Sequence, residues 1–328
     1  MVNAMKIVAN GLNLEVEDSP AAMGLEADSA PVRSRPAVML IMGLGMQLIA
    51  WPPALVQGLL DAGFRVVRFD NRDSGLSQRL DALGTPNLLW QGIKYRLGWR
   101  IAPPYTIQDM ARDALGVLDA LGIERAHVVG VSMGGMVAQW LALLAPARVL
   151  SLASVMSSSG ARGLPGPTPE ASRALLSRPA GTGQSAVIEH AVKLFKIIGS
   201  PGFPMDDADL RARVTAATQR SYKPRGIARQ MVAIVADTGR ANQLADVTAP
   251  TLVVHGKADP LVPYACGEDT ARRIPGATLI GIDGMGHDLA PVVVNHLLAA
   301  LIPHIQAAEA AYHAQPTRLP DMGKSGAA

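Results

Sequence analysis

Short apolar runs alternate with helical patterns through the first half of the chain. Residues 37–42 form a continuous apolar run, as expected of a strand that is buried on both faces, and residues 65–69 predict the next strand. Between them, residues 51–62 suit a helix, because the prolines in this segment stand in its first turn. Residues 106–121 place an apolar side chain every three or four positions behind Thr106, so they predict an amphipathic helix capped by that threonine.

The same alternation continues to residue 156. A strand is predicted at 126–131, a helix at about 134–145 and another strand at 149–156. Strands that alternate with helices in this way predict a mostly parallel sheet with helices on both faces.

The pattern then changes, and this change divides the chain. Residues 157–248 begin with a loop and carry only helical patterns, near residues 170–177, 184–198, 206–221 and 226–237. Strand patterns return at 251–255 and 277–282, and a final helix is predicted at 289–309. We therefore expect an α/β core formed by residues 1–156 and 249–309, interrupted by a helical cap at 157–248.

Two further segments are predicted to lack regular secondary structure. Residues 18–36 predict a long surface loop between two early strands, and residues 310–328 predict a flexible tail.

Composition narrows the class of protein. The chain has 328 residues, with 17% charged residues and a net charge of +3. The basic residues are scattered rather than clustered, so no nucleic-acid partner is expected. The single cysteine, Cys266, permits no internal disulfide, predicts a packed and inert thiol, and fits a reducing, cytoplasmic location.

Two uncharged stretches reach the ~20 residues that a membrane span needs. They are residues 36–60 and 128–147, and both contain several glycines or prolines. Each is better explained as a buried strand, a glycine turn and a helix, so no membrane span is expected. The first twenty residues also lack the apolar core of a signal peptide.

Residues 130–134 read Gly-Val-Ser-Met-Gly, between a predicted strand and a predicted helix. In this context G-x-S-x-G forms a nucleophile elbow, in which a tight turn lifts the hydroxyl of Ser132 above the sheet. Small residues two positions before and after the serine let the strand and the helix pack closely. The free amides of the new helix then point at the same place.

Other interpretations of this stretch fit less well. A phosphate loop of the G-x-x-x-x-G-K-[ST] type needs a lysine, and none lies nearby. The spacing of residues 130–135 does not match G-x-G-x-x-G, the dinucleotide fingerprint. A structural turn with an idle serine stays open on the pentapeptide alone.

A serine nucleophile needs a base, and His287 is the best candidate among seven histidines. It stands in the flexible turn Gly284-Met285-Gly286-His287-Asp288, just after the last predicted strand. The remaining histidines fall within predicted strands or helices or in the tail that follows the last helix; they are at positions 127, 190, 255, 296, 304 and 313. Asp288, next to the base, is expected to cap the final helix.

The acid that orients the base should follow the preceding strand, in the order serine, acid, histidine. Asp259 does so, in a loop off the carboxyl end of the strand at 251–255. Asp283 is a rival, but it stands only four residues before His287 at the end of a strand, so we predict a turn residue there.

An oxyanion needs two backbone donors. One should be the amide of Met133, which follows the nucleophile. The other should come from the glycine loop after the strand at 37–42, with the amide of Leu44 as our choice and Gly43 or Gly45 as alternatives.

Taken together, these residues resemble the α/β-hydrolase family over roughly residues 5–305. Some local stretches resemble the aclacinomycin methylesterase group of bacterial esterases more specifically; they are residues 42–43 with 51–52, 69–77, and 199–204 with 206–207. Many relatives have His-Gly where this chain has Met42-Gly43, which removes a side chain that braces the loop but keeps the backbone donor.

The expected function is that of a serine esterase, a carboxylic ester hydrolase that acts on small to medium, fairly apolar esters through Ser132, His287 and Asp259. No metal and no organic cofactor is required. Hydrolysis of a thioester, an amide or a carbon–carbon bond, perhydrolysis, and a low-turnover ligand receptor remain alternatives, and the oligomeric state is open. An apolar stripe in the cap at 187–198 is expected to pack against the core, or else to line an acyl pocket.

Overall fold

The computed structural model describes residues 4–19 and 35–314. Most of the predicted loop at 18–36 and residues 315–328 of the predicted tail lie outside the described residues. The element bounds below refer to the described part of the chain.

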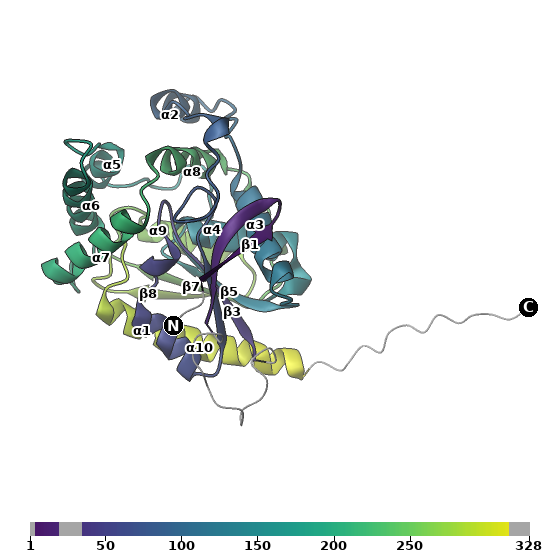
Figure 1. Cartoon of the computed structure of the whole chain (residues 1–328). Helices are drawn as coiled ribbons and strands as arrows, with labels where there is room; N and C mark the ends of the chain where they lie inside the picture. Colours follow the sequence, from purple (N-terminus) through teal and green to yellow (C-terminus); the bar gives the residue numbers. More distant parts are fainter. Residues whose placement is uncertain (1–3, 20–34, 315–328) are drawn as a thin grey trace, which may run out of the picture.

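The centre of the molecule is an eight-stranded sheet in the order β1-β2-β4-β3-β5-β6-β7-β8 (Figure 1). The strands are β1 (Ala4–Ala9), β2 (Leu12–Asp18), β3 (Ala37–Ile41), β4 (Arg65–Phe69), β5 (Ala126–Val131), β6 (Val149–Val155), β7 (Thr251–Gly256) and β8 (Thr278–Ile282). Pairing is antiparallel for β1 with β2 and for β2 with β4, and parallel for the others. The mostly parallel sheet is therefore confirmed.

Both faces of the sheet are covered, as the continuous apolar strands predict. In β3, Val38 and Leu40 pack into one apolar cluster while Met39 and Ile41 pack into the other. Helices α1 (Pro53–Asp61) and α10 (Pro291–His313) close the first face. Helices α3 (Ile107–Ala120), α4 (Met133–Leu144) and α9 (Tyr264–Arg273) lie on the second face.

The start of α3 follows from its cap, whereas the bounds of the final helix differ from the prediction. Thr106 caps α3 as predicted, and it forms a reciprocal capping box with Asp109. The final helix was predicted at 289–309. It starts after Ala290 and continues to His313, so it begins and ends later than predicted. The predicted tail from residue 310 is therefore wrong for residues 310–313.

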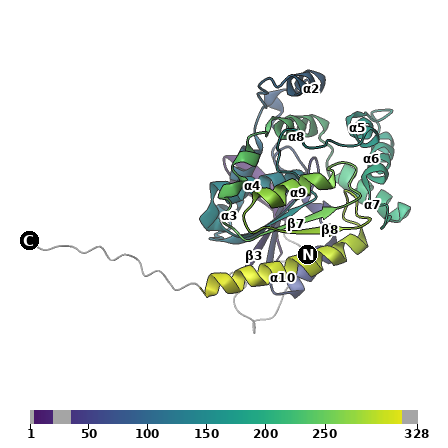
Figure 2. The ribbon, with the colours of Figure 1, turned by 180° about the vertical axis from the view of Figure 1, so that it is seen from behind.

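Between β6 and β7 the chain is entirely helical or irregular, as predicted. This insert contains α5 (Pro169–Leu176), α6 (Gln184–Ile198), α7 (Asp207–Arg220) and α8 (Pro224–Ala236), and no strand is assigned within residues 157–248, all of which are described. Helices α5, α6 and α7 lie together at one side, and α8 lies over the core (Figures 1 and 2). Short 3-10 helices complete the chain: η3 (Leu48–Ala50), η4 (Asp81–Leu83), η5 (Pro146–Arg148), η6 (Arg240–Asn242) and η7 (Leu244–Asp246).

Part of the apolar stripe of α6 packs against the neighbouring helix α7. Ile188, Ala191 and Phe195 join Val192 in a small cluster with Leu210 and Val214 of α7. These three side chains thus hold α6 and α7 together.

The stretches of membrane-span length form strand-turn-helix units. Residues 36–60 contain β3, η3 and most of α1, and residues 128–147 contain most of β5 and all of α4. Among the described residues, α10 is the one helix long and apolar enough to cross a membrane by length and composition. Its side chains Val293, Leu297 and Leu301 are buried in the core beneath the sheet.

Candidate active site

The elbow at Ser132 joins β5 to α4 in a strained conformation. Ser132 has φ 55° and ψ −123°, values that a residue with a side chain rarely adopts. A Cβ atom on Gly130 would lie 2.1 Å from the carbonyl oxygen of Gly134, and one on Gly134 would lie 2.0 Å from that of Ile41. A glycine at 130 therefore lets β5 and α4 pack closely, as the sequence predicts, and a glycine at 134 lets α4 pass close to β3.

The structure brings the imidazole of His287 to the serine. His287 Nε2 lies 2.9 Å from Ser132 Oγ, and His287 Nδ1 lies 2.7 Å from Asp259 Oδ2. A carboxylate can only accept a hydrogen bond, so the proton stands on Nδ1 and Nε2 is free to accept the serine proton. The three side chains come from loops that follow β5, β7 and β8.

The loop after β7 is built around the carboxylate of Asp259. Its Oδ1 accepts the amides of Leu261 and Val262 at 2.9 and 2.8 Å, which leaves Oδ2 for His287. Buried His255 donates from Nε2 to the carbonyl of Val262 at 2.7 Å, and this Nε2 lies 3.7 Å from Asp259 Oδ2. Burial lowers the pKa of His255, so this neutral imidazole braces the acid loop.

The helical insert between β6 and β7 holds the loop that carries His287. The backbone amide of His287 donates to the carbonyl of Ile198 at 2.7 Å, and the amide of Gly286 donates to Ser200 Oγ at 2.9 Å. Asp288 accepts the hydroxyl and the amide of Ser200. The prediction that Asp288 caps the final helix is wrong, because Ala290 occupies that position and Asp288 is already engaged by the cap.

The glycine loop after β3 passes directly beside the serine. A Cβ atom on Gly43 would lie 3.2 Å from Ser132 Cβ and 3.6 Å from Ser132 Oγ. The amide of Gly45 donates to Gln230 Oε1 at 2.8 Å, so Gly45 is no longer an alternative oxyanion donor. Met133 is the first residue of α4, so its amide has no acceptor within the helix.

Gln230, on α8, braces this loop and was missed by sequence reasoning. It is fully buried, and its Nε2 donates to the carbonyl of Arg72 and to Ser74 Oγ at 2.8 and 3.0 Å. The side chain thus joins the turn after β4 to the glycine loop. A Cβ atom on Gly45 would meet Ile227 of the same helix at 2.8 Å, so α8 lies tightly over the loop.

A second set of contacts fixes the end of this loop. Gln47 Nε2 donates to the carbonyls of Ala217 and Ser221 at 2.7 and 2.8 Å. Arg220 donates to Gln47 Oε1 and to Asp70 Oδ2, each at 2.7 Å. The side chains of Gln230, Gln47 and Arg220 therefore join the helical insert to the glycine loop. These contacts brace a loop that has Met42 in place of the histidine found in many relatives.

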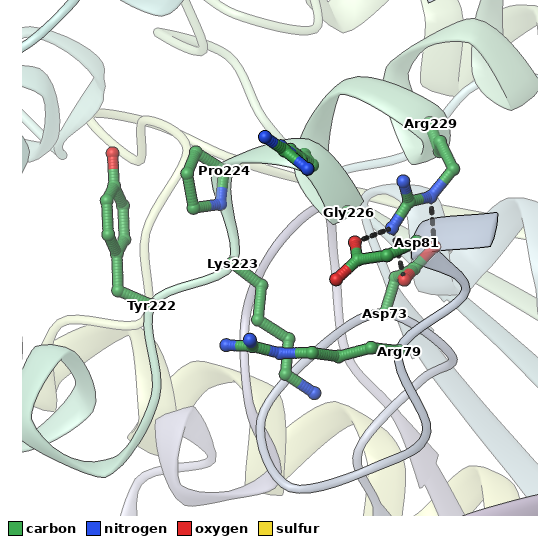
Figure 3. A pocket seen from close by; sticks show the side chains of 9 residues that line it. Asp73, Arg79, Asp81, Tyr222, Lys223, Pro224, Gly226 and Arg229 are labelled. Atoms are coloured by element: carbon green, nitrogen blue, oxygen red, sulfur yellow. Dashed lines mark hydrogen bonds and ion pairs between the residues drawn. The ribbon is translucent and has the colours of Figure 1, made fainter. Parts of the chain in front are cut away.

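A pocket of about 230 Å³ lies where α8 begins, next to the turn after β4 (Figure 3). Arg229 reaches Asp73 with two hydrogen bonds of 2.8 and 2.7 Å and contacts Asp81 at 3.0 Å. The hydrogen bonds to Asp73 raise the pKa of Arg229. Neither Ser132 nor His287 lines this pocket, so we interpret the ion pair as an anchor of α8.

The rejected candidates lie away from the serine. His127 is buried between Ser151 Oγ and Glu309, each at 2.9 Å. Asp283 is exposed and pairs with Lys257 at 3.0 Å. Burial raises the pKa of the Cys266 thiol to about 11, which agrees with an inert cysteine. Within the part of the chain that the structure describes, no group of three or more histidine, cysteine or acidic side chains is arranged to hold a metal ion.

Comparisons with known proteins identify the family and the fold. The sequence model of the alpha/beta hydrolase fold matches residues 36–291. The chain is 32% identical over 291 residues to rhodomycin D methylesterase of Streptomyces sp. strain C5, covering 83% of this chain and 91% of the relative. The same enzyme of Streptomyces peucetius is 31% identical over 291 residues with the same coverage. The enol-lactonase of Burkholderia xenovorans LB400 shares the fold, with a TM-score of 0.66 and 21% identity over 92% of this chain and 100% of that chain.

Proposed function

The chain belongs to the alpha/beta hydrolase fold family, and on that premise we propose that it is a serine carboxylic ester hydrolase. The observation that carries the proposal is the unbroken hydrogen-bonded series from Asp259 through His287 to Ser132, with links of 2.7 and 2.9 Å. A buried acid, a neutral imidazole and a strained serine in this order activate the hydroxyl for attack on a carbonyl carbon.

In the proposed reaction, Ser132 Oγ attacks the ester carbonyl while its proton passes to His287 Nε2. The Asp259 carboxylate stabilises the imidazolium and keeps the ring in place. His287 then protonates the leaving alcohol, which leaves an acyl group on Ser132. A water molecule, deprotonated by the same histidine, releases the carboxylic acid and restores the serine.

The developing oxyanion is proposed to lie between the amides of Met133 and Leu44. Support comes from the position of Met133 at the start of α4, where the amides and the helix dipole favour negative charge. The close approach of Gly43 to Ser132 brings the glycine loop to the same side. With Gly45 engaged by Gln230, Leu44 is preferred and Gly43 is the remaining alternative.

We propose small to medium, fairly apolar esters as substrates, methyl esters among them because two relatives carry the name of a methylesterase. The test uses methyl, ethyl and butyl esters of one aromatic acid, with the thioester and the anilide of the same acyl group. We expect one acid and one alcohol released per ester cleaved, with slow or absent cleavage of the anilide. Folded protein that leaves every ester intact, or that cleaves the anilide fastest, would contradict the proposal.

The bracing by Gln230 predicts a specific kinetic effect. Methionine has a similar length but cannot accept the Gly45 amide, so Gln230→Met should let the glycine loop drift from its position beside Ser132. Misplacement by about 1 Å can cost about 100-fold in rate. We therefore expect kcat to fall by about 10- to 100-fold with little change in KM, measured by steady-state ester hydrolysis.

Two further variants separate positioning from folding. Gln230→Glu keeps an oxygen that can accept the Gly45 amide, so it should retain more activity than Gln230→Met. Gln139→Met replaces another fully buried glutamine, which bonds to Ser154 rather than to the loop, and should leave kcat nearly unchanged. Equal losses for Gln230→Met and Gln139→Met would show that the effect is one of packing.

A further inference from the structure

Helix α2 (Leu88–Arg96) presents its apolar side chains to solvent. Leu89, Ile93 and Leu97 recur every four residues, and they are 81%, 47% and 56% exposed. Trp90 and Trp99 beside them are also exposed. A helix of an ordinary globular protein turns such a stripe toward the core, whereas α2 has no buried residue at all.

No part of the described chain lies over the apolar stripe of α2. In both views the helix lies at the outer end of the molecule, beyond α8 and away from the sheet (Figures 1 and 2). Its half-buried side chains, Leu88, Gln91 and Lys94, recur at intervals of three and mark the side that faces the rest of the chain. The apolar stripe is on the other side of the helix.

The aromatic side chains are held in place. The rings of Trp90 and Trp99 meet edge to face with centroids 6.2 Å apart, and Lys94 Nζ lies 5.8 Å from the centre of the Trp90 ring. Tyr95 stacks with Arg162 at 5.7 Å. Amphipathic aromatic rings beside cations are typical of segments that lie at the boundary between a lipid bilayer and water.

The charge of the segment is of one sign. Lys94, Arg96 and Arg100 stand among the apolar residues, and the sequence has no acidic residue from 82 to 108. Within the described chain, none of these three cations forms an ion pair with a carboxylate. Juxtaposed basic and apolar side chains on an exposed helix bind anionic lipid through both charge and burial.

We propose that residues 88–100 dock the protein on the surface of an anionic lipid bilayer. Leu89, Trp90, Ile93, Leu97 and Trp99 would enter the interface, while Arg96 and Arg100 contact lipid headgroups. Charge complementarity favours this occupant over a second copy of the chain. A symmetric dimer through α2 would place Arg96 and Arg100 against cations of its partner, with no acidic residue of the segment to compensate. The inference does not depend on the proposed esterase activity.

Cosedimentation of the full chain with vesicles tests the proposal. One set consists of phosphatidylcholine alone and the other of equal parts phosphatidylcholine and phosphatidylglycerol. We expect saturable binding to the anionic vesicles, weakened by salt, with a blue shift of tryptophan fluorescence as Trp90 and Trp99 leave water. Since one cation near such a surface contributes about fivefold in affinity, Arg96→Gln/Arg100→Gln should weaken binding by about 25-fold.

The apolar residues and the controls complete the test. Leu89→Ser/Leu97→Ser should reduce binding at least tenfold, and because no residue of α2 is buried, its circular dichroism should match the wild type. Leu176→Ser and Arg213→Gln change exposed residues on α5 and α7 and should bind like the wild type. The proposal is overturned if the wild type ignores anionic vesicles, if all variants bind alike, or if ultracentrifugation shows a dimer that only the α2 variants lose.

Discussion

Ser132→Ala is expected to lower the kcat of ester hydrolysis by about 10⁶-fold, and His287→Ala by a similar factor. Both side chains act in a single step, in which the serine attacks only as the imidazole takes its proton across 2.9 Å. The double variant should therefore lose no more than either single variant. Steady-state kinetics of the three proteins, with the same ester, measures this lack of additivity.

A matched control variant distinguishes loss of catalysis from loss of folding. Ser154 is a buried serine on the neighbouring strand β6, and its hydroxyl bonds to Gln139. Ser154→Ala should keep kcat within about threefold of the wild type, since a single distant hydrogen bond contributes little to the reacting geometry. Additive losses in the Ser132 and His287 cycle would mean that the two side chains act in separate steps.

Asp259→Asn is expected to reduce kcat by about 10⁴-fold while the protein stays folded. An amide is nearly the same size as the carboxylate, but it can present N–H where His287 Nδ1 now donates. The imidazole would then carry its proton on Nε2, and a protonated Nε2 cannot accept the proton of Ser132. The imidazolium formed during the reaction would also lose its buried countercharge. The measurement is kcat at a pH where the wild type is fully active.

Asp283→Asn supplies the matched comparison, because Asp283 was the rival acid in the sequence. Its carboxylate is exposed and pairs with Lys257 rather than with an imidazole. Exposed pairs of this kind contribute little, so this variant should hydrolyse esters at nearly the wild-type rate. A loss at Asp283 as large as that at Asp259 would require another assignment of the acid.

Most of the fold could be predicted because its strands and helices bury apolar side chains that recur at regular positions in the sequence. The apolar run of β3 and the stripe of α3 reflect burial directly, so both were found to within a residue or two of their ends. Helix α9 was missed, since it is short, polar and interrupted by Gly267. Helix α2 was also missed, because it is short, contains Gly92 and mixes basic with apolar residues.

The candidate site was predictable where backbone geometry restricts the residue type. Backbone carbonyl groups of other residues occupy the positions that Cβ atoms on Gly130 and Gly134 would take. Only glycine fits there, so the elbow is recognisable from the local sequence. Ser132, Asp259 and His287 were located by their order after strands, and the structure places them at hydrogen-bonding distance, although their roles remain predictions. Gln230 and Ser200 carried no such signal, because their partners are more than 80 residues away in the sequence.

The helical insert at 157–248 thus holds loops of the candidate site in place. The predicted separation of this insert from the α/β core did not suggest such a role. Ile198 and Ser200 hold the loop of His287, while Gln230 holds the glycine loop. All three contacts reach backbone amides, which belong to His287, Gly286 and Gly45. We therefore interpret residues 157–248 as part of the framework of the site.

The central claim is that Ser132 is an activated nucleophile. Incubation with a fluorophosphonate, followed by intact-mass measurement and peptide mapping, tests it most directly. We predict one adduct per chain, attached to Ser132, with no adduct on Ser132→Ala and much slower formation on Asp259→Asn. A folded wild-type protein that forms no adduct, or labelling that persists undiminished in Ser132→Ala, would contradict the account.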